Sequence, residues 1–291
     1  MKPAPFKYLA PSSIQEALEL LHEHGADAKL LAGGQSLIPA MNFRLLQPAV
    51  LIDLNRVQEL DYIEPGEDGG VRIGAMTRQS RVERDDRVAE VSPLLHETMP
   101  NIAHRQIRNR GTIGGSLVHA DPAAELPVVT TTLRGRFKLR SLDGERWLGA
   151  QDFFLGMFTT AIDTEEILQE IAIEPSPPNT GWAFLEVARR SGDYAMAGVA
   201  AMVELGDEGL CARARLVYLN VGDGPVESTA AVERIIGEKP EPGAFSECAR
   251  IAAEEELDPF GNLHASPEYQ RHLARVLTQR ALQVAAERAA A

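Results

Sequence analysis

Residues 29–37 read KLLAGGQSL, and this stretch decides the fold because an apolar run stops at two glycines and restarts as a predicted helix. Glycine lacks a Cβ, so it reaches positive φ cheaply and lets a ligand approach the backbone. Successive N–H groups in such a turn can converge into an anion-binding concavity. Residues 110–116, RGTIGGS, form a second turn of this kind. We predict that the two turns hold one diphosphate between them.

Either glycine pair alone is more typical of an ordinary turn than of a binding site. Each pair is followed by a serine and an apolar residue, however, and this repetition favours a site. Neither turn matches GxGxxG or GxxxxGK[ST], so a doubly wound dinucleotide fold and a P-loop are both disfavoured.

Composition excludes several classes of function. The chain has 291 residues, of which 44% are hydrophobic, and a net charge of −13. Nucleic-acid and anionic membrane partners are disfavoured, because both require clustered Lys and Arg. Cys211 and Cys248 are too few for a disulfide framework or a cluster site, so we expect a reducing cytoplasm. We also expect no membrane span and no export signal.

Hydrophobic periodicity predicts an N-terminal α+β unit that ends near residue 55. Ser13 is expected to cap a helix that Gly25 ends. A strand is expected at 28–31, a helix at 37–46, where Pro48 follows, and a strand at 50–54.

The elements predicted between residues 56 and 173 are a strand, two helices, a strand after the second glycine pair, a helix and two strands. They span 71–75, 77–86, 94–104, 116–119, 123–133, 136–140 and 166–173. Asp121 and Pro122 are expected to begin the helix at 123.

A proline-rich stretch at 174–179 is the best linker candidate. Beyond it we expect three strands followed by three helices, an α+β pattern that implies a second domain. They span 182–188, 195–205, 212–221, 226–236, 244–256 and 269–290. The predicted domains are 1–177, with subdomains of about 1–55 and 56–177, and 178–291.

No acid, base or nucleophile stands out. The chain has no HExxH pair, no Cys–His cluster and no GxSxG elbow. This pattern is typical of proteins in which a cofactor carries the chemistry. Asp121 and Glu125 would suit hydroxyl or N–H groups of a ligand. The alternative for Asp121 is that it caps the helix and has no contact with a ligand. Tyr194 could flank a flat heterocycle or pack as an ordinary strand residue.

Several segments resemble the FAD-binding medium subunit of molybdenum hydroxylases, of the carbon monoxide dehydrogenase and xanthine dehydrogenase family. The likeness covers nearly the whole chain. The segments are AGGQSLIP (32–39), IRNRGTIGGS (107–116), ADPAAELP (120–127), ARRSGDYA (188–195) and ASPEYQRHL (265–273).

The resemblance implies an α+β fold. An FAD-binding domain of the vanillyl-alcohol-oxidase (PCMH) type, in two subdomains, would precede a C-terminal domain with a three-stranded antiparallel sheet and helices. FAD would be held noncovalently, with its diphosphate between the two glycine turns. Leu168 would pack beside FAD, and Tyr194 beside its isoalloxazine ring. The implied cofactor-binding residues are Ala32, Gly33, Gly34, Gln35, Ser36, Leu37, Thr112, Gly114, Gly115, Ser116, Asp121, Glu125, Leu168 and Tyr194. Family members often carry Asn at position 116 and Asp at 125, which keeps a polar group at each.

The resemblance also implies partners: a small subunit with two iron–sulfur clusters and a large molybdopterin subunit, arranged as a dimer of heterotrimers. Electrons would pass from molybdenum through the clusters to FAD and then to an external acceptor. Two alternatives stay open at this point. One is a stand-alone flavin-dependent oxidoreductase on the same fold, and the other is a scaffold subunit that has lost its flavin.

Overall fold

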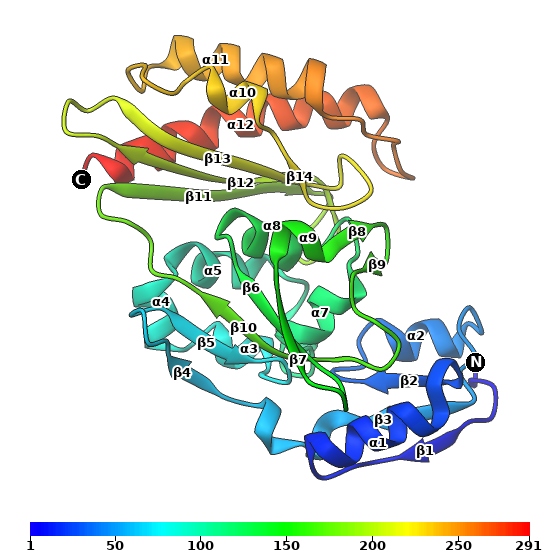
Figure 1. Ribbon diagram of the computed structural model, residues 1–291. Coiled ribbons are helices and arrows are strands. Elements are labelled where there is room, and N and C mark those ends of the chain that lie inside the picture. The colour runs from blue at the N-terminus through cyan, green and yellow to red at the C-terminus, as the bar shows by residue number, and fades with distance from the viewer.

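The computed structural model describes residues 1–291. Figure 1 shows a lower part made by the N-terminal half of the chain and an upper part made by the C-terminal residues. The connection between them runs through residues 174–179, the stretch expected to be a linker. We keep 177/178 as a proposed domain boundary.

A small parallel sheet lies at the bottom of the molecule (Figure 1). Its order is β1 (Lys7–Leu9), β3 (Val50–Asp53) and β2 (Ala28–Leu31). Helix α1 (Ile14–His24) begins as predicted, because the Ser13 side chain accepts a hydrogen bond from the Glu16 amide at 3.2 Å. Its apolar residues are buried in one core with those of β3.

Helix α2 (Leu37–Asn42) follows β2 after the first glycine turn and is shorter than the predicted 37–46. The chain turns out of the helix at Arg44, whose φ is 58°. The amide of Leu45 then bonds back to the Ala40 carbonyl at 2.9 Å.

An antiparallel five-stranded sheet forms the centre of the lower part, in the order β4-β5-β10-β6-β7. Ile171 of the middle strand pairs with Ile73 on one side and Phe137 on the other, and all three side chains are fully buried. A short hairpin, β8 with β9, lies beside it. The strands are β4 (Ile63–Pro65), β5 (Val71–Gly74), β6 (Arg136–Arg140), β7 (Glu145–Gly149), β8 (Phe154–Gly156), β9 (Thr159–Thr160) and β10 (Ile167–Ile173).

Seven short helices cover this sheet. They are α3 (Gln79–Val82), α4 (Asp86–Val91), α5 (Pro93–Thr98), α6 (Arg105–Arg108), α7 (Ile113–His119), α8 (Glu125–Thr132) and α9 (Ala150–Phe153). The single helices expected at 77–86 and 94–104 are therefore wrong. The second of them is interrupted after α5 by a 3₁₀ turn at Met99–Asn101.

Two expectations around the second glycine pair are corrected by α7 and α8. Residues 116–119 are helical rather than a strand, because Thr112 caps α7 by accepting the Gly115 amide at 3.0 Å. Helix α8 begins at Glu125, and its N-cap is Ala124 rather than Asp121. The Asp121 carboxylate instead accepts the Ala123 amide at 2.9 Å, within the turn before the helix.

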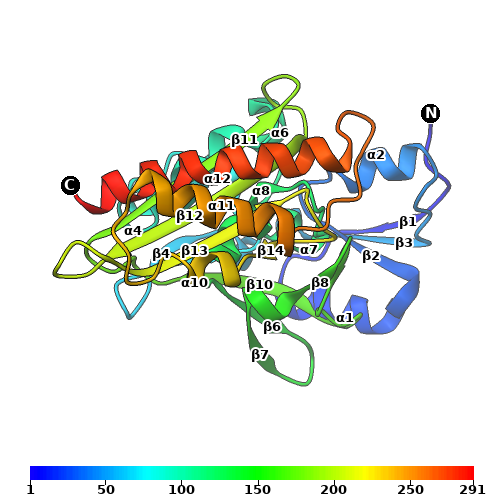
Figure 2. The same ribbon diagram turned by 90° about the horizontal axis from the view of Figure 1, so that it is seen from above.

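The upper part is an antiparallel sheet with helices on its outer face (Figures 1 and 2). Its strands are β11 (Thr180–Ala188), β12 (Ala195–Leu205), β13 (Cys211–Leu219) and β14 (Val226–Glu227). The sheet therefore has four strands and not the predicted three. Because β14 pairs with β13, the helix expected at 226–236 is reduced to α10 (Ala230–Glu233). It is followed by α11 (Pro242–Ile251), a π-helical turn at Ala252–Glu256, and the long α12 (Pro267–Ala289).

Both faces of the upper sheet are buried. On β11, Ala183 belongs to the core under α10–α12, whereas Trp182 and Phe184 pack against the core of the lower part. On β13, Tyr218 likewise belongs to the core under the helices, and Val217 belongs to the core of the lower part. The sheet thus closes the top of the lower part. No helix of the protein is long and apolar enough to cross a membrane.

Helix α12 approaches β11 most closely at Gly181, and we expect Gly181→Ala to destabilise the protein. A Cβ at this position would lie 1.8 Å from the Ala285 carbonyl oxygen and 2.5 Å from the Ala289 amide nitrogen. Overpacking of this kind should lower the free energy of unfolding by about 3 kcal/mol. Urea titration would measure the loss. Gly243→Ala is the matched control, because no atom lies within 4 Å of its added Cβ. Equal midpoints for the two variants would contradict the expected packing.

Candidate cofactor site

The two glycine turns touch each other. A Cβ built on Gly33 would lie 2.5 Å from the Arg110 carbonyl oxygen and 2.7 Å from the Gly111 Cα. A Cβ built on Gly115 would lie 3.2 Å from the Ala32 Cβ. The two motifs, far apart in the sequence, therefore meet backbone to backbone, and this approach requires glycine at position 33.

The first turn offers a continuous set of hydrogen-bond donors. None of the backbone N–H groups from Ala32 to Leu37 donates to an acceptor within the chain. Gly34 reaches a φ of 73°, as expected of a glycine in such a turn. Buried or half-buried amides are normally paired, so a run of free donors indicates a ligand that accepts from them. A diphosphate, with its several anionic oxygens, fits this donor set.

The second turn uses its amides differently from the sequence interpretation, in which amides of both turns converge on the ligand. The amides of Gly114, Gly115 and Ser116 donate to Ala75 O, Thr112 Oγ1 and Thr112 O, at 2.9, 3.0 and 3.3 Å. Only the Thr112 amide among these residues has no acceptor in the chain. The second turn therefore contributes mainly its close backbone approach and its hydroxyl groups.

Gly114 has a packing role. A Cβ there would lie 2.5 Å from the Ala75 Cβ, so this glycine allows α7 to lie against the end of β5. It is fully buried, whereas Gly115 and Ser116 are partly exposed. Of the two glycines in the second motif, Gly115 is the one nearer to the first turn.

Asn55 and Arg78 connect the two turns, and sequence reasoning missed both. Asn55 Nδ2 donates to the Ala32 carbonyl at 2.9 Å. Arg78 donates to the Asn55 side-chain oxygen and, with its other terminal nitrogen, to the Arg110 carbonyl. Burial and the nearby Arg110 charge lower the pKa of Arg78. The only signal in the sequence was the position of Asn55, just after the strand predicted at 50–54. That strand pairs with β2, which leads into the first turn.

Asp121 and Glu125 lie near each other at the start of α8. Asp121 is half-buried, and Glu125 is 7% exposed. Burial raises the pKa of Glu125 to about 7, and the Asp121 charge acts in the same direction. A third carboxyl group, Glu186 on β11, was not predicted. Burial, followed by the charge of Glu125, raises its pKa to about 8.

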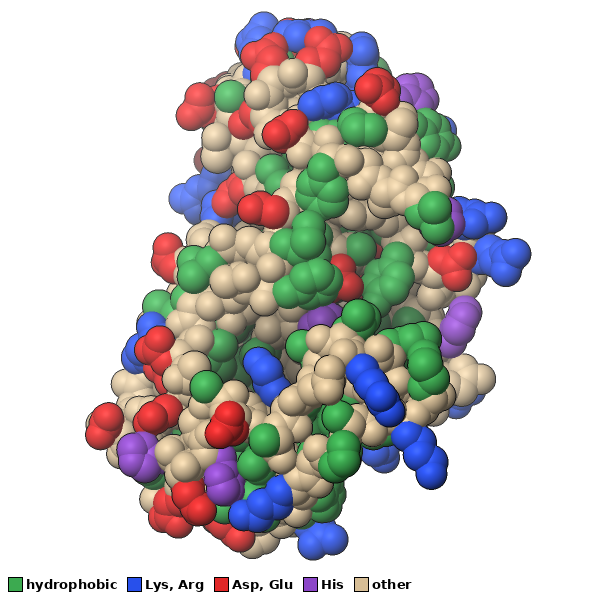
Figure 3. Space-filling model, turned by 90° about the vertical axis from the view of Figure 1, so that its right-hand side faces the viewer, with side chains coloured by type: hydrophobic (Ala, Val, Ile, Leu, Met, Phe, Trp, Pro, Cys, Tyr) green, Lys and Arg blue, Asp and Glu red, His purple; other side chains and the backbone are tan.

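Tyr194 lies in the turn between β11 and β12 and is 68% exposed. With Asp121, Asn220 and His264 it lines a cavity of about 250 Å³. Figure 3 shows that this side of the molecule is hollowed between its upper and lower parts, with hydrophobic side chains gathered around the hollow. The Tyr194 ring is therefore available to a ligand rather than buried as an ordinary strand residue.

Leu168 lies on β10 and is 4% exposed within the core of the lower part. Its burial is equally consistent with core packing and with contact to a cofactor, so its predicted role stays a prediction.

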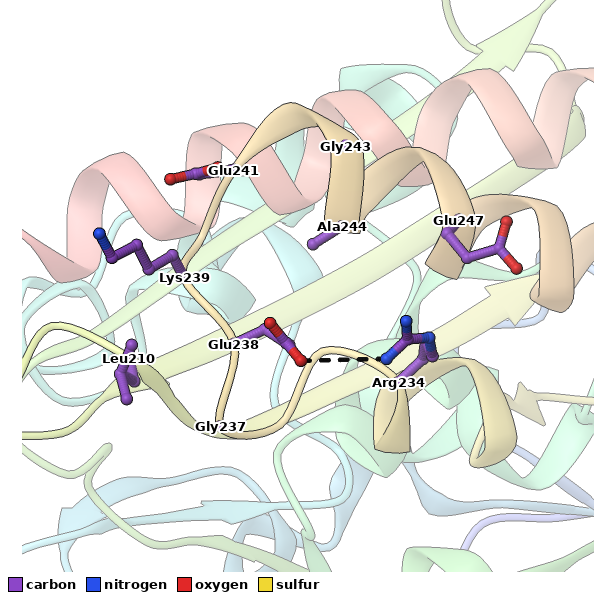
Figure 4. A pocket seen from close by; sticks show the side chains of 9 residues that line it. All are labelled: Leu210, Arg234, Gly237, Glu238, Lys239, Glu241, Gly243, Ala244 and Glu247. Atoms are coloured by element: carbon purple, nitrogen blue, oxygen red, sulfur yellow. Dashed lines mark ion pairs between the residues drawn. The ribbon is translucent and has the colours of Figure 1, made fainter.

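A larger cavity, of about 500 Å³, lies on the upper part and contains none of the predicted residues. Figure 4 shows side chains of both charges around it, with Arg234 paired to Glu238 at 3.9 Å.

The protein is expected to lose stability as the pH rises, because Glu125 and Glu186 keep their protons longer when folded. Their folded pKa values, about 7 and about 8, exceed the ordinary value of 4.5. Between these limits the folded state binds more protons than the unfolded state, so the free energy of unfolding falls with pH. The slope is about 1.4 kcal/mol per pH unit for each retained proton, and it vanishes above about pH 8.

Urea titrations of the FAD-free protein from pH 5 to pH 9 would measure this slope. The E125Q/E186Q variant should show a flatter profile, because amides do not ionise. An unchanged profile in that variant would contradict the assignment.

Comparison with known proteins places this chain in a class of flavoproteins. Residues 4–176 match the family described as FAD binding domain in molybdopterin dehydrogenase, and residues 182–285 match the CO dehydrogenase flavoprotein C-terminal domain. The chain belongs to the family of FAD-binding medium subunits of molybdenum hydroxylases. The family resemblance seen in the sequence is thereby confirmed.

Similar proteins are subunits of larger enzymes. The chain is 40% identical to the 6-hydroxypseudooxynicotine dehydrogenase complex subunit alpha of Paenarthrobacter nicotinovorans, over 99% of this chain and 97% of that protein. It is 36% identical to the carbon monoxide dehydrogenase medium chain of Hydrogenophaga pseudoflava, over the full length of both. A solved carbon monoxide dehydrogenase from Hydrogenophaga pseudoflava, which lacks the Mo-pyranopterin moiety of its molybdenum cofactor, superimposes with a TM-score of 0.95. That match has 36% identity and covers 99% of each chain.

Proposed function

We propose that this protein is the electron-transfer subunit of a molybdenum hydroxylase, in which noncovalent FAD passes electrons from a partner's iron–sulfur clusters to an external acceptor. The observation that carries the proposal is the run of free amides from Ala32 to Leu37 beside a second turn that packs against it. FAD, when bound, supplies the redox chemistry, since it can take up and release electrons.

The chain's own groups would bind and orient this cofactor. The amides of residues 32–37 would hold the diphosphate charge, which fixed N–H dipoles can stabilise without reorganising. The hydroxyls of Ser36, Thr112 and Ser116 would add polar contacts at the same place. Asp121 and Glu125 would accept from hydroxyl or N–H groups of the cofactor, and Tyr194 would flank its ring.

The remaining redox centres would lie on partner subunits. Iron–sulfur clusters are held by several cysteine thiolates. The chain has only Cys211 and Cys248, and both are fully buried in the core of the upper part. Burial raises the pKa of Cys248 to about 12, which disfavours a thiolate there. We therefore propose that a small iron–sulfur subunit holds the clusters. The family resemblance adds a large molybdopterin subunit, and we propose that the three chains form a cytoplasmic dimer of heterotrimers.

Reconstitution tests the cofactor assignment. The FAD-free chain should bind one FAD and turn yellow, and ADP should compete with FAD because it carries the same diphosphate. Riboflavin, which has no phosphate, should compete poorly. A chain that stays colourless in excess FAD would overturn the proposal.

Co-purification tests the partner assignment. Co-expression with a small iron–sulfur subunit and a large molybdopterin subunit, encoded by neighbouring genes, should yield a complex that reduces FAD when its substrate is added. The isolated, FAD-loaded chain should not oxidise organic substrates. Turnover by that isolated chain would instead favour a stand-alone flavin oxidoreductase.

A further inference from the structure

Two carboxyl groups, a buried one on Glu125 and a half-buried one on Glu186, face the boundary between the upper and lower parts. Glu125 begins α8 in the lower part, and Glu186 lies on β11 of the upper part. Glu186 has the same parity along its strand as Trp182 and Phe184, whose side chains pack against the lower core. It therefore extends from the inner face of the sheet toward the lower part, where the charge of Glu125 acts on it. Each residue comes from a different element, so only the folded chain brings them together.

Glu186 is incompletely satisfied. Its Oε2 atom is buried and has no hydrogen-bond partner in the chain. An ionised carboxylate in such a place would carry a large desolvation penalty. A proton on the carboxyl group removes most of that penalty, because the neutral acid is far less costly to bury.

No free cation compensates these two acids. The positive charge that acts on Glu125 is that of Arg108, and its guanidinium already binds Glu83 at 2.8 and 3.0 Å. The same guanidinium also donates to the Ile102 carbonyl at 2.9 Å. Asp121, from the turn before α8, adds another negative charge.

We propose that Glu125 and Glu186 together retain a proton in the folded protein, and that they take up a further proton from solvent when the neighbouring flavin gains negative charge on reduction. This inference rests on the proposed function, because it places FAD near Asp121, Glu125 and Tyr194. FAD, when bound, would supply the acceptor for two electrons from the iron–sulfur clusters of the proposed partner, and the proton that balances part of this charge would form an O–H bond on a carboxylate of the pair. No bond is formed between protein and flavin.

The physical reason is reciprocal linkage. A negative charge near a carboxylate raises its affinity for a proton, and proton binding in turn makes reduction easier. Both carboxyls titrate close to neutral pH, as burial raises the pKa of Glu125 to about 7 and that of Glu186 to about 8. Asp121, whose charge acts on Glu125, lines the cavity of about 250 Å³ together with Tyr194.

Spectroelectrochemical titration of the FAD-loaded protein tests the proposal. The dependence of the flavin midpoint potential on pH reports the number of protons taken up per flavin reduced. Between pH 6 and pH 9, E125Q/E186Q should take up fewer protons than the wild type, by up to roughly one per flavin. Infrared difference spectra on reduction should show a protonated-carboxyl signal in the wild type that the variant lacks. Glu90→Gln, an exposed position on α4, is the control and should leave both readouts unchanged.

The possible failures can be told apart. A wild-type chain that never retains FAD defeats the proposed function itself. An E125Q/E186Q variant that retains FAD and shows the wild-type pH dependence defeats only the proton-uptake inference. Should the double variant fail to fold or to retain FAD, Glu186→Gln alone carries the same test, and its pH dependence should still be weaker than that of the wild type.

Discussion

Gly33→Val is expected to abolish FAD binding and to destabilise the FAD-free protein as well. The added Cβ would lie 2.5 Å from the Arg110 carbonyl oxygen and 2.7 Å from the Gly111 Cα, and both are backbone atoms that cannot rotate away. The two turns would therefore have to separate. The free amides of the first turn would then shift away from the second turn, and the proposed diphosphate site would be disrupted.

The magnitude follows from overpacking of backbone against backbone. We expect a loss of about 3 kcal/mol in the free energy of unfolding and no measurable flavin after reconstitution. The fold is affected as well as the ligand site, because the valine meets the backbone of the second turn. Flavin absorbance and urea titration measure the two effects. Gly224→Val is the matched control, because its added Cβ meets nothing within 4 Å. A Gly33→Val protein with a full complement of FAD would show that the two glycine turns do not form the diphosphate site.

Arg108→Met is the second large effect we expect. Arg108 is 7% exposed and binds the Glu83 carboxylate through two nitrogens, at 2.8 and 3.0 Å. It also holds the Ile102 carbonyl, and it ends the helix whose Ile107 carbonyl accepts the Gly111 amide at 2.7 Å. Its removal leaves a partly buried carboxylate without a cation and releases the segment that leads into the second glycine turn.

Breaking a buried ion pair from one side costs about 3–5 kcal/mol, because the remaining charge is left uncompensated. Stability should therefore fall steeply, and FAD affinity should fall with it. Arg105→Met, on the exposed face of the same helix, should have little effect on either. The double variant E83M/R108M should recover part of the loss, since it removes both charges. A single variant as stable as the Arg105→Met protein would show that the pair contributes nothing.

Local sequence signals predicted most elements of the fold. The cap at Ser13 and the long strand at 195–205 appear with their expected residues. The strand expected at 116–119 is wrong because Leu117 and Val118 favour a strand locally, while the cap supplied by Thr112 and the contact with Ala75 favour a helix. The two-residue strand β14 is too short to leave a periodic pattern, and only its pairing with β13 defines it.

The site could be predicted only in its local parts. Each glycine turn is visible in the sequence. The prediction that both turns hold one diphosphate also implied that they lie close together. Asn55 and Arg78 join those turns through hydrogen bonds that bridge more than twenty residues of sequence, and no short pattern encodes such bonds. Glu186 looks like an ordinary polar position of a strand. Its unusual environment depends on α8, which comes from the other part of the chain.

The sheet β11–β14 has a consequence for how this polypeptide tolerates cutting. Its inner face, with Trp182, Phe184 and Leu219, belongs to the same core as the strands far below it. A protease nick between residues 174 and 179 should therefore leave two fragments that stay together on gel filtration until denaturant is added. Either fragment produced alone would expose to water the apolar surface that it now buries against the other part, and we expect it to accumulate as insoluble material.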